Sequence, residues 1–371
     1  MKNKITKKLV LSIVLSSIVI ASFAQVTLKD AYKGYFYIGA AINSPVFSGQ
    51  NAKAGELLAQ QFNSTTPENE MKWERLCSKP GVYNFDQADK YVDFAEKNKM
   101  FIVGHCLVWH SQVPNWVFSD STGKPLSREA LLERMREHIT KVVTRYKGRI
   151  NGWDVVNEAL NEDGTMRQSR WYKIIGEDFI EKAFEYAHTA DPKAELYYND
   201  YNIEMPAKRA GAIRIIKNLK AKGIFISGVG IQGHWHLPSP SIVDIDSSIM
   251  LFGQLGVKVH ITELDVNVLP NPDNFSGADV SANFQQKREM NPYTAGLPDS
   301  VQAKLTQRYV DFFKVFIKYK GTVARVTTWG IDDNMSWLNG WPIRGRTNYP
   351  LLFDRNFQPK PVVDALIKLV K

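Results

Sequence analysis

The sequence is poor in cysteine and contains no concentrated block of basic residues. Its 371 residues include only two cysteines, Cys77 and Cys106, so a disulfide-dense scaffold is excluded. An exported chain permits one disulfide, but we favour two buried thiols, because Cys106 lies in an apolar run where a small hydrophobic side chain also fits. The 47 lysines and arginines are scattered, without an interleaved aromatic stripe. Nucleic-acid binding needs a concentrated basic face, so that class of function is excluded.

The sequence also lacks an apolar run long enough to favour a membrane span, which needs about 20 residues. The run at roughly residues 9–20 is shorter; it follows four lysines and precedes Ser22-Phe23-Ala24, which has small residues at the two positions that a signal peptidase reads. We therefore expect residues 1–24 to be a removed signal peptide, with no stable membrane insertion. The mature protein would be periplasmic or extracellular. An uncleaved N-terminal anchor is the alternative.

Short apolar runs, typical of buried parallel strands, alternate with longer helical patterns. Ala88, Tyr91, Val92 and Ala95 share one helix face, and Pro206 and Pro298 each open a helix. The candidate strands are residues 35–42, 62–66, 101–105, 150–157, 194–199, 227–232, 257–262 and 323–329. Eight strands, each followed by a helix, predict an α/β fold, a single (β/α)8 TIM barrel over residues 25–371.

Two connections in this barrel are long, residues 265–297 after the seventh strand and 330–359 after the eighth. Long loops in a compact domain are usually functional or mobile. In a barrel they follow the carboxyl ends of the strands, which form the active-site face. We therefore expect the functional site to lie beneath them.

Two glutamates stand out at this face. Glu158 follows the fourth strand and Glu263 ends the seventh, and these strands face each other across an eight-stranded barrel. Retaining glycoside hydrolysis needs a protonated and an ionised carboxyl group about 5–5.5 Å apart. An ordinary surface glutamate is the alternative for either residue, but the Asn157-Glu158 pair directly after an apolar run argues against it.

The other polar and aromatic residues near the strand ends suit a carbohydrate, whose apolar faces stack on indoles and whose hydroxyls need directional hydrogen bonds. No phosphate-cradling glycine loop occurs there. Four histidines could form a metal site, but their spacing matches no compact motif such as H-E-x-x-H, so we expect no metal and no cofactor. These histidines are His105, His110, His234 and His236. Core packing remains the alternative for the tryptophans.

An ordered series of motifs resembles glycoside hydrolase family 10, the endo-β-1,4-xylanases, over about residues 35–369. The motifs are T-P-E-N-E-M-K-W (66–73), G-H-C-L-V-W-H-S-Q-V-P-N-W (104–116), W-D-V-V-N-E-A (153–159), Y-N-D-Y-N (198–202), Q-G-H (232–234), I-T-E-L-D (261–265) and W-G-I-D-D-N-M-S-W (329–337). Each motif alone is weak, but the ordered combination is highly specific.

The resemblance implies a retaining double displacement on xylan, with Glu158 as acid/base and Glu263 as nucleophile. It further implies that Asn157 binds the sugar 2-hydroxyl. By the same resemblance, His234 hydrogen-bonds the nucleophile, Asp265 lies behind His234, and Gln232 and Trp109 lie beside the acid/base. The residues implied to bind xylose hydroxyls on the glycone side are Glu68, Asn69, Lys72 and His105. Trp329 and Trp337 would form the walls of the glycone subsites, and Tyr201 would be an aromatic residue on the aglycone side.

The expected partners are xylan and xylo-oligosaccharides, and we expect a monomer. Two departures from the family pattern occur: Cys106 replaces a common threonine, and the 265–297 loop is long, which leaves the aglycone side open. A cellulase or mannanase of the same clan would share the two glutamates, and a dual xylanase/cellulase preference is a further alternative. A non-catalytic xylan-binding or inhibitor-like barrel is the alternative from another class.

Overall fold

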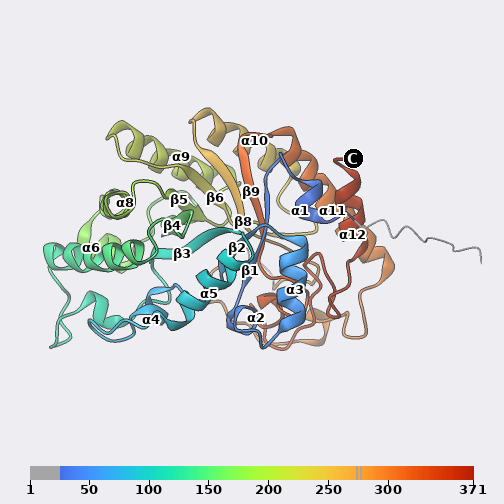
Figure 1. Ribbon diagram of the computed structural model, residues 1–371, viewed down its shortest axis with the longest axis horizontal. Coiled ribbons are helices and arrows are strands. Elements are labelled where there is room, and N and C mark those ends of the chain that lie inside the picture. The colour runs from blue at the N-terminus through green and yellow to red at the C-terminus, as the bar shows by residue number, and fades with distance from the viewer. Residues whose placement is uncertain (1–25, 273–274, 276–277) are drawn as a thin grey trace, which may run out of the picture.

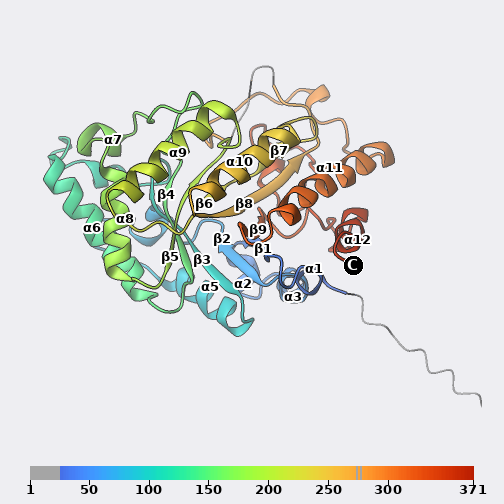
Figure 2. The ribbon, with the colours of Figure 1, turned by 90° about the horizontal axis from the view of Figure 1, so that it is seen from above.

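Eight parallel strands close into a barrel that is surrounded by helices (Figures 1 and 2). The computed structural model describes residues 26–272, 275 and 278–371, so the predicted signal peptide lies outside the described residues. The predicted (β/α)8 barrel is confirmed. Among the described residues, no helix is long and apolar enough to cross a membrane.

The barrel strands follow the order of the chain, and the ring closes where the last strand pairs with the first. Neighbouring strands pair in parallel from β1 through β6, β6 pairs with β8, and β9 lies between β8 and β1. The barrel strands are β1 (Tyr37–Ile42), β2 (Ser64–Pro67), β3 (Phe101–Trp109), β4 (Gly152–Asn157), β5 (Glu195–Asp200), β6 (Gly228–Ile231), β8 (Lys258–Asn267) and β9 (Val323–Thr328).

The largest differences from the sequence prediction involve three strands, and the other bounds differ by one or two residues. β3 and β8 continue past their predicted ends, to Trp109 and Asn267. A short strand that was not predicted, β7 (His234–His236), pairs with this extension of β8 outside the barrel ring. In β8 the extension carries Glu263 and Asp265, which interrupt the apolar run by which the strand was recognised. In β3 the extension, residues 106–109, is itself apolar and follows the polar His105, where the predicted strand ended.

Helices on the outside cover the barrel, and each strand of the ring is followed by at least one. They are α2 (Ser44–Phe47), α3 (Ala52–Gln61), α4 (Trp73–Leu76), α5 (Asp86–Lys97), α6 (Arg128–Arg145), α7 (Arg170–Ile175), α8 (Phe179–Ala190), α9 (Pro206–Ala221), α10 (Ile242–Gln254), α11 (Asp299–Lys318) and α12 (Pro361–Lys368). The short helix α1 (Leu28–Ala31) precedes the barrel and packs against α12, where the Tyr32 hydroxyl donates to the Leu366 carbonyl. Three 3-10 turns, η1 (Asn115–Phe118), η2 (Arg288–Met290) and η3 (Trp337–Asn339), lie in the connections.

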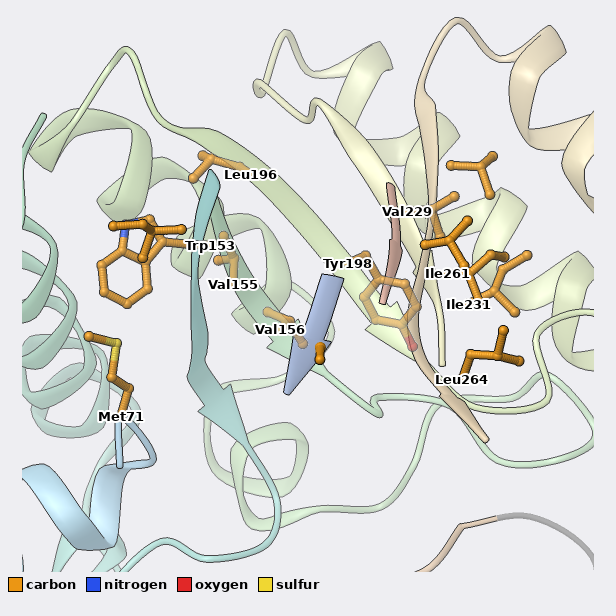
Figure 3. Close-up of a cluster of buried hydrophobic side chains, with 14 of the residues drawn as sticks. Met71, Trp153, Val155, Val156, Leu196, Tyr198, Val229, Ile231, Ile261 and Leu264 are labelled. Atoms are coloured by element: carbon orange, nitrogen blue, oxygen red, sulfur yellow. The ribbon is translucent and has the colours of Figure 1, made fainter. Parts of the chain in front are cut away.

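The hydrophobic core forms where the strands meet this helical layer. Figure 3 shows Trp153, Val155, Leu196, Val229 and Ile261 along β4, β5, β6 and β8, all buried. Burial of this apolar surface is the main source of stability. Both cysteines are buried free thiols, as predicted.

The interior of the barrel is polar toward its amino-terminal end. Arg325 and His260 are register partners on β9 and β8 and are both buried, and the Tyr197 ring lies 4.4 Å from that of His260. A small residue must face these long side chains: a Cβ on Gly228 would lie 2.7 Å from His260 Nε2. Glycine is therefore required at this position of β6.

Candidate active site

Glu158 leaves the end of β4 in a left-handed backbone conformation, with φ of +58°. Few residues other than glycine adopt this conformation, and it persists where surrounding contacts impose it. The Glu158 amide donates to the Asn199 carbonyl at 2.9 Å, and Arg167 Nε donates to the Glu158 carbonyl at 3.1 Å. Both contacts fix the turn that directs the carboxyl group into the cleft.

Three donors surround the Glu158 carboxyl group. Trp109 Nε1 donates at 2.8 Å, Gln232 Nε2 at 3.0 Å and Asn157 Nδ2 at 3.2 Å. Burial raises the pKa of Glu158, the bonds from Gln232 and Trp109 oppose that rise, and the nearby charge of Glu263 adds to it. The charge of Glu263 therefore contributes to the raised pKa of Glu158, but burial is the larger cause.

Glu263 lies within β8 and has the opposite pKa displacement. His234 Nε2 lies 3.1 Å from Oε2, and Asn199 Nδ2 donates to Oε1 at 2.8 Å. Burial alone would raise the pKa of Glu263, but the bond from His234 and the neighbouring histidines outweigh it and hold the pKa below its usual value. Glu263 is therefore the ionised member of the pair at neutral pH.

His234 connects Glu263 to a second carboxylate. Its Nδ1 lies 3.1 Å from Asp265 Oδ2, and Trp337 Nε1 donates to the same oxygen at 2.7 Å. Burial would lower the pKa of His234, but Asp265 and Glu263 together raise it to about 10. The imidazole is therefore a cation that faces the two carboxylates from both of its nitrogens.

An amide links the two glutamates and was missing from the predicted site. Asn199 Nδ2, at the end of β5, donates to Glu263 Oε1 and to Asn157 Oδ1, both at 2.8 Å. Thr262 Oγ1 donates to Asn199 Oδ1 at 2.7 Å and so fixes the amide orientation. The signal was available, because Asn199 lies in the Y-N-D-Y-N motif at the end of a predicted strand.

The predicted glycone-side residues surround the same cleft. Lys72 Nζ donates to Asn69 Oδ1 at 3.0 Å and to Gln112 Oε1 at 2.7 Å, and it lies 4.9 Å from the centre of the Trp109 ring. Burial lowers the pKa of Lys72 and raises that of Glu68. The cleft is lined by Glu68, Asn69, Lys72, His105, Trp109, Gln112, Asn157, Glu158, Gln232, His234, Glu263, Ala278, Val280, Trp329 and Trp337.

The four histidines do not converge on one point. His105 Nδ1 pairs with Asp154 Oδ2 at 2.9 Å, and Asp154 was not among the predicted site residues. Burial lowers the pKa of His110 to about 4, and its Nδ1 lies 4.0 Å from Glu158 Oε2. His236 Nε2 lies 3.2 Å from Asn271 Nδ2. These positions fit hydrogen-bonding and orienting roles.

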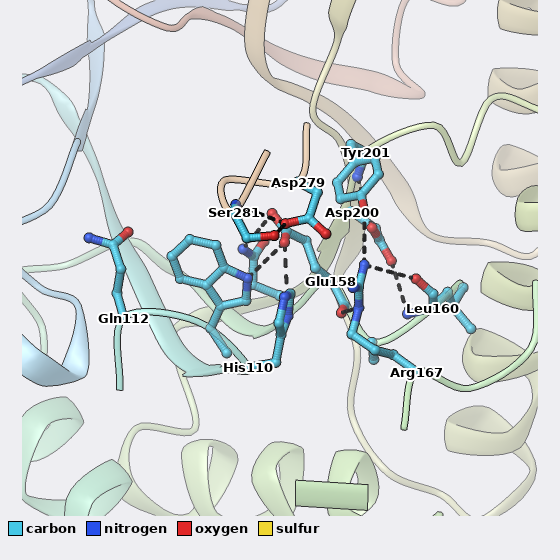
Figure 4. Close-up of polar contacts among 12 residues, drawn as sticks. His110, Gln112, Glu158, Leu160, Arg167, Asp200, Tyr201, Asp279 and Ser281 are labelled. Carbon is cyan, nitrogen blue, oxygen red and sulfur yellow. Dashed lines mark hydrogen bonds and ion pairs between the residues drawn. The ribbon is translucent and has the colours of Figure 1, made fainter. Parts of the chain in front are cut away.

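Tyr201 is placed beside the cleft but is not among its lining residues. Its side chain is buried, and Arg167 Nη2 lies 2.9 Å from its hydroxyl (Figure 4). Lys208 Nζ lies 3.5 Å from the centre of its ring. Lys208 in turn pairs with the buried Asp200 at 3.0 Å. The ring is thus held through both its face and its hydroxyl, close to the turn that carries Glu158.

The fold and this pair of carboxyl groups define a glycoside hydrolase. Two buried glutamates whose pKa values are displaced in opposite directions can supply a proton and a nucleophile to the same bond, and indoles beside them provide apolar walls for sugar rings. Comparison with known proteins gives the particular family. The model of Glycosyl hydrolase family 10 matches residues 27–369, and the chain belongs to this family.

Named relatives are similar over nearly the whole chain. Endo-1,4-beta-xylanase A of Xylanibacter ruminicola is 51% identical over 345 residues, which cover 93% of this chain and 94% of the relative. A solved GH10 endoxylanase from a sugarcane soil metagenome is 50% identical, with a TM-score of 0.90. The match covers 92% of this chain and 99% of the endoxylanase chain. A mutant structure in complex with xylotriose is 38% identical, with a TM-score of 0.82, over 92% of this chain and 99% of its own.

Proposed function

We propose that this chain cleaves internal β-1,4-xylosidic bonds of xylan and retains the anomeric configuration, with Glu263 as nucleophile and Glu158 as acid/base. The chain is an endo-1,4-β-xylanase of glycosyl hydrolase family 10. The observation that supports the two roles is the opposite displacement of the two pKa values within one hydrogen-bonded network. The xylotriose complex of a structural relative supports the substrate class.

In the first step, a Glu263 carboxylate oxygen attacks the anomeric carbon as the glycosidic bond breaks. The leaving oxygen takes the proton of Glu158, and a covalent glycosyl-enzyme forms. The amide of Asn157 donates to the 2-hydroxyl of the reacting sugar, an interaction that strengthens in the transition state. Asn199 and His234 keep Glu263 ionised and oriented for this attack.

In the second step, Glu158 changes from acid to base. The covalent bond removes the charge of Glu263, which had raised the pKa of Glu158, so this pKa falls. Glu158 then takes a proton from water, whose oxygen attacks the anomeric carbon from the face that the leaving group vacated. Glu263 departs as a carboxylate, and Glu158 is again protonated for the next cycle.

The glycone-side groups would hold the non-reducing part of the chain. Glu68, Asn69, Lys72 and His105 supply charged and polar contacts for xylose hydroxyls. Trp329 and Trp337 supply indole walls that disfavour a C5 hydroxymethyl group and therefore favour xylose over glucose. Gln232 and Trp109 orient Glu158, Asp265 orients His234, and Tyr201 supports the aglycone side.

Initial reducing-sugar release from xylan and from carboxymethylcellulose, measured side by side, tests the substrate. We expect strong release from xylan alone. Comparable release from the cellulose would keep the mechanism but overturn the xylose assignment, whereas no release from either would favour a binding protein.

Azide rescue tests the two roles. Glu158→Ala with a good leaving group and external azide should yield a β-linked glycosyl azide, because azide then attacks the covalent intermediate of Glu263. Glu263→Ala should abolish turnover, while xylan binding survives. An α-azide from Glu158→Ala would overturn the assignment.

We also propose that the chain is exported after cleavage behind Ala24 and acts as a monomer. The basic start, apolar run and Ser22-Phe23-Ala24 support export. Mass spectrometry of the protein from cell fractions should find Gln25 at its N-terminus in the periplasm or the medium, and light scattering should give one chain per particle. A cytoplasmic protein that retains Met1 would contradict the export.

A further inference from the structure

The segment Ala278–Ser281, from the long connection between β8 and α11, lies over the leaving-group side of the cleft. Ala278 and Val280 line the same cleft as the two catalytic glutamates. Figure 4 shows Asp279 above Glu158, toward Tyr201 and Arg167 and away from the glycone-side Gln112. The segment therefore occupies the aglycone side of the cleft, for which the sequence motifs supply only Tyr201.

Aromatic residues anchor this segment to the glycone wall. Trp341 stacks on Trp337 at 4.1 Å between ring centres and donates through Nε1 to the Asp279 carbonyl at 3.1 Å. Phe275 and Phe284 pack against each other at 5.1 Å, and the Phe284 amide donates to the Pro342 carbonyl at 2.9 Å. The connection is thus fixed to the loop that follows β9, and the position of Asp279 is set by packing as well as by its own turn.

The Asp279 carboxylate has one oxygen engaged and one directed elsewhere. The amide and hydroxyl of Ser281 both donate to Oδ1, at 2.9 and 2.7 Å. No hydrogen bond from the described residues reaches Oδ2. Burial would raise the pKa of Asp279, but the Ser281 bonds and the charge of Arg167 outweigh it and lower the pKa. The group is therefore an anion with a remaining acceptor oxygen beside the acid/base.

We propose that Asp279 is a specificity-determining residue for the leaving group: its carboxylate accepts hydrogen bonds from hydroxyls of the departing xylose and disfavours a glucuronate substituent there. The inference rests on the proposed function, because it names the aglycone contact of that same site. A carboxylate is an acceptor for sugar hydroxyls, and it repels a second carboxylate at short range. Arg167 and His110 face the same carboxylate, the first as a cation and the second as a neutral imidazole.

Two substrates with the same glycone separate this role from the chemistry. Xylotetraose places a xylose on the leaving-group side, whereas 4-nitrophenyl β-xylobioside places an aryl group there. Asp279→Ala should lower kcat/KM on xylotetraose about tenfold more than on the aryl glycoside, as expected for loss of a hydrogen bond to a charged group. Equal losses on both substrates, or no loss on either, would overturn the proposal.

A second variant tests the charge without changing the shape. Asp279→Asn should raise kcat/KM on a glucuronate-bearing xylo-oligosaccharide about fivefold relative to the undecorated one, from the loss of charge repulsion at short range in water. Asp299→Asn, an exposed carboxylate at the start of α11, is the matched control and should leave this ratio unchanged. An unchanged ratio in Asp279→Asn would refute the charge effect. Inactivity of the unaltered enzyme on the aryl xylobioside would instead refute the proposed function.

Discussion

At the scale of single residues, the two glutamates of the site differ in their surroundings more than in their burial. Both are at most 5% exposed. Within the described part of the chain, the hydrogen-bond donors to the Glu158 carboxyl group are all neutral, whereas Glu263 faces the cationic His234. Environment alone therefore separates an acid from a nucleophile in two chemically identical side chains.

This difference predicts a bell-shaped dependence of kcat/KM on pH. Activity requires Glu158 protonated, so it is lost as pH rises through the raised pKa of Glu158. It also requires Glu263 ionised, so it is lost as pH falls through the lowered pKa of Glu263. A pH profile on an aryl xylobioside measures both limbs. Glu158→Gln should remove the alkaline limb, and an alkaline limb that persists in this variant would contradict the assignment.

Replacement of His234 should move the acidic limb. His234→Asn removes the cation that lowers the pKa of Glu263, so this pKa rises. As pH is decreased, activity should therefore begin to fall at a higher pH than in the unaltered enzyme. We also expect kcat to fall roughly 10²-fold, as for loss of a donor that stabilises catalytic charge. His188→Asn, a histidine on α8 that packs against Phe225, is the control. An acidic limb at the same pH in both variants would show that His234 does not tune Glu263.

The sequence allowed the charged members of the site to be predicted, but fewer of their supports. The structure brings Glu158, Glu263, His234 and Asp265 into one network, as expected from motifs at the ends of successive strands. Asn199 was not assigned, although its motif marked the end of a strand, because its partner Glu263 lies two strands along the barrel; Arg167 was not assigned because it bonds a backbone carbonyl. Such contacts depend on three-dimensional geometry and not on residue type, and the roles themselves stay predictions.

At the scale of elements, β6 supports the site through the absence of a side chain. A Cβ on Gly230 would lie 2.2 Å from Asn199 Oδ1 and 2.8 Å from Thr262 Cγ2. Gly230→Ala should therefore displace Asn199 from Glu263, lower kcat, and cost about 1–3 kcal/mol of unfolding free energy through overpacking. Urea unfolding and initial rates measure the two effects.

Gly55→Ala in α3 is the matched control for this change. The nearest atoms to a Cβ there lie 3.7 Å away, which is ordinary contact. A glycine inside a helix costs roughly 0.5–1 kcal/mol relative to alanine, so this variant should be slightly more stable and fully active. Full activity of Gly230→Ala at normal stability would show that Asn199 is not held by the space beside β6.

The number and order of the barrel strands could be predicted, but not all of their ends. Short apolar runs located most strands of the ring, because parallel strands are buried on both faces, although β2 carries serine and threonine side chains. The extension of β8 alternates Glu263, Asp265 and Asn267 with the apolar Leu264 and Val266, so it is not a continuous apolar run, and β7 has only three residues. The two segments pair through the register between His234 and Asp265, which is a tertiary contact.

At the scale of the whole molecule, stability should not depend on redox conditions. Cys77 and Cys106 are both free and buried. The melting temperature should therefore be the same with and without dithiothreitol, and a thiol assay should find two free thiols only after denaturation. A lower melting temperature in reductant would contradict the free-thiol state.

The pairing of β1 with β9 also affects how the chain folds during its synthesis. Tyr37 pairs with Arg325, which is synthesised about 290 residues later. At about 5–20 residues per second, roughly 15 to 60 seconds separate the two strands during translation. Until β9 emerges, β1 remains an edge strand whose unpaired backbone groups can join another chain. A ribosome that stalls before β9 would therefore release an open, aggregation-prone sheet, even though every catalytic side chain had already been made.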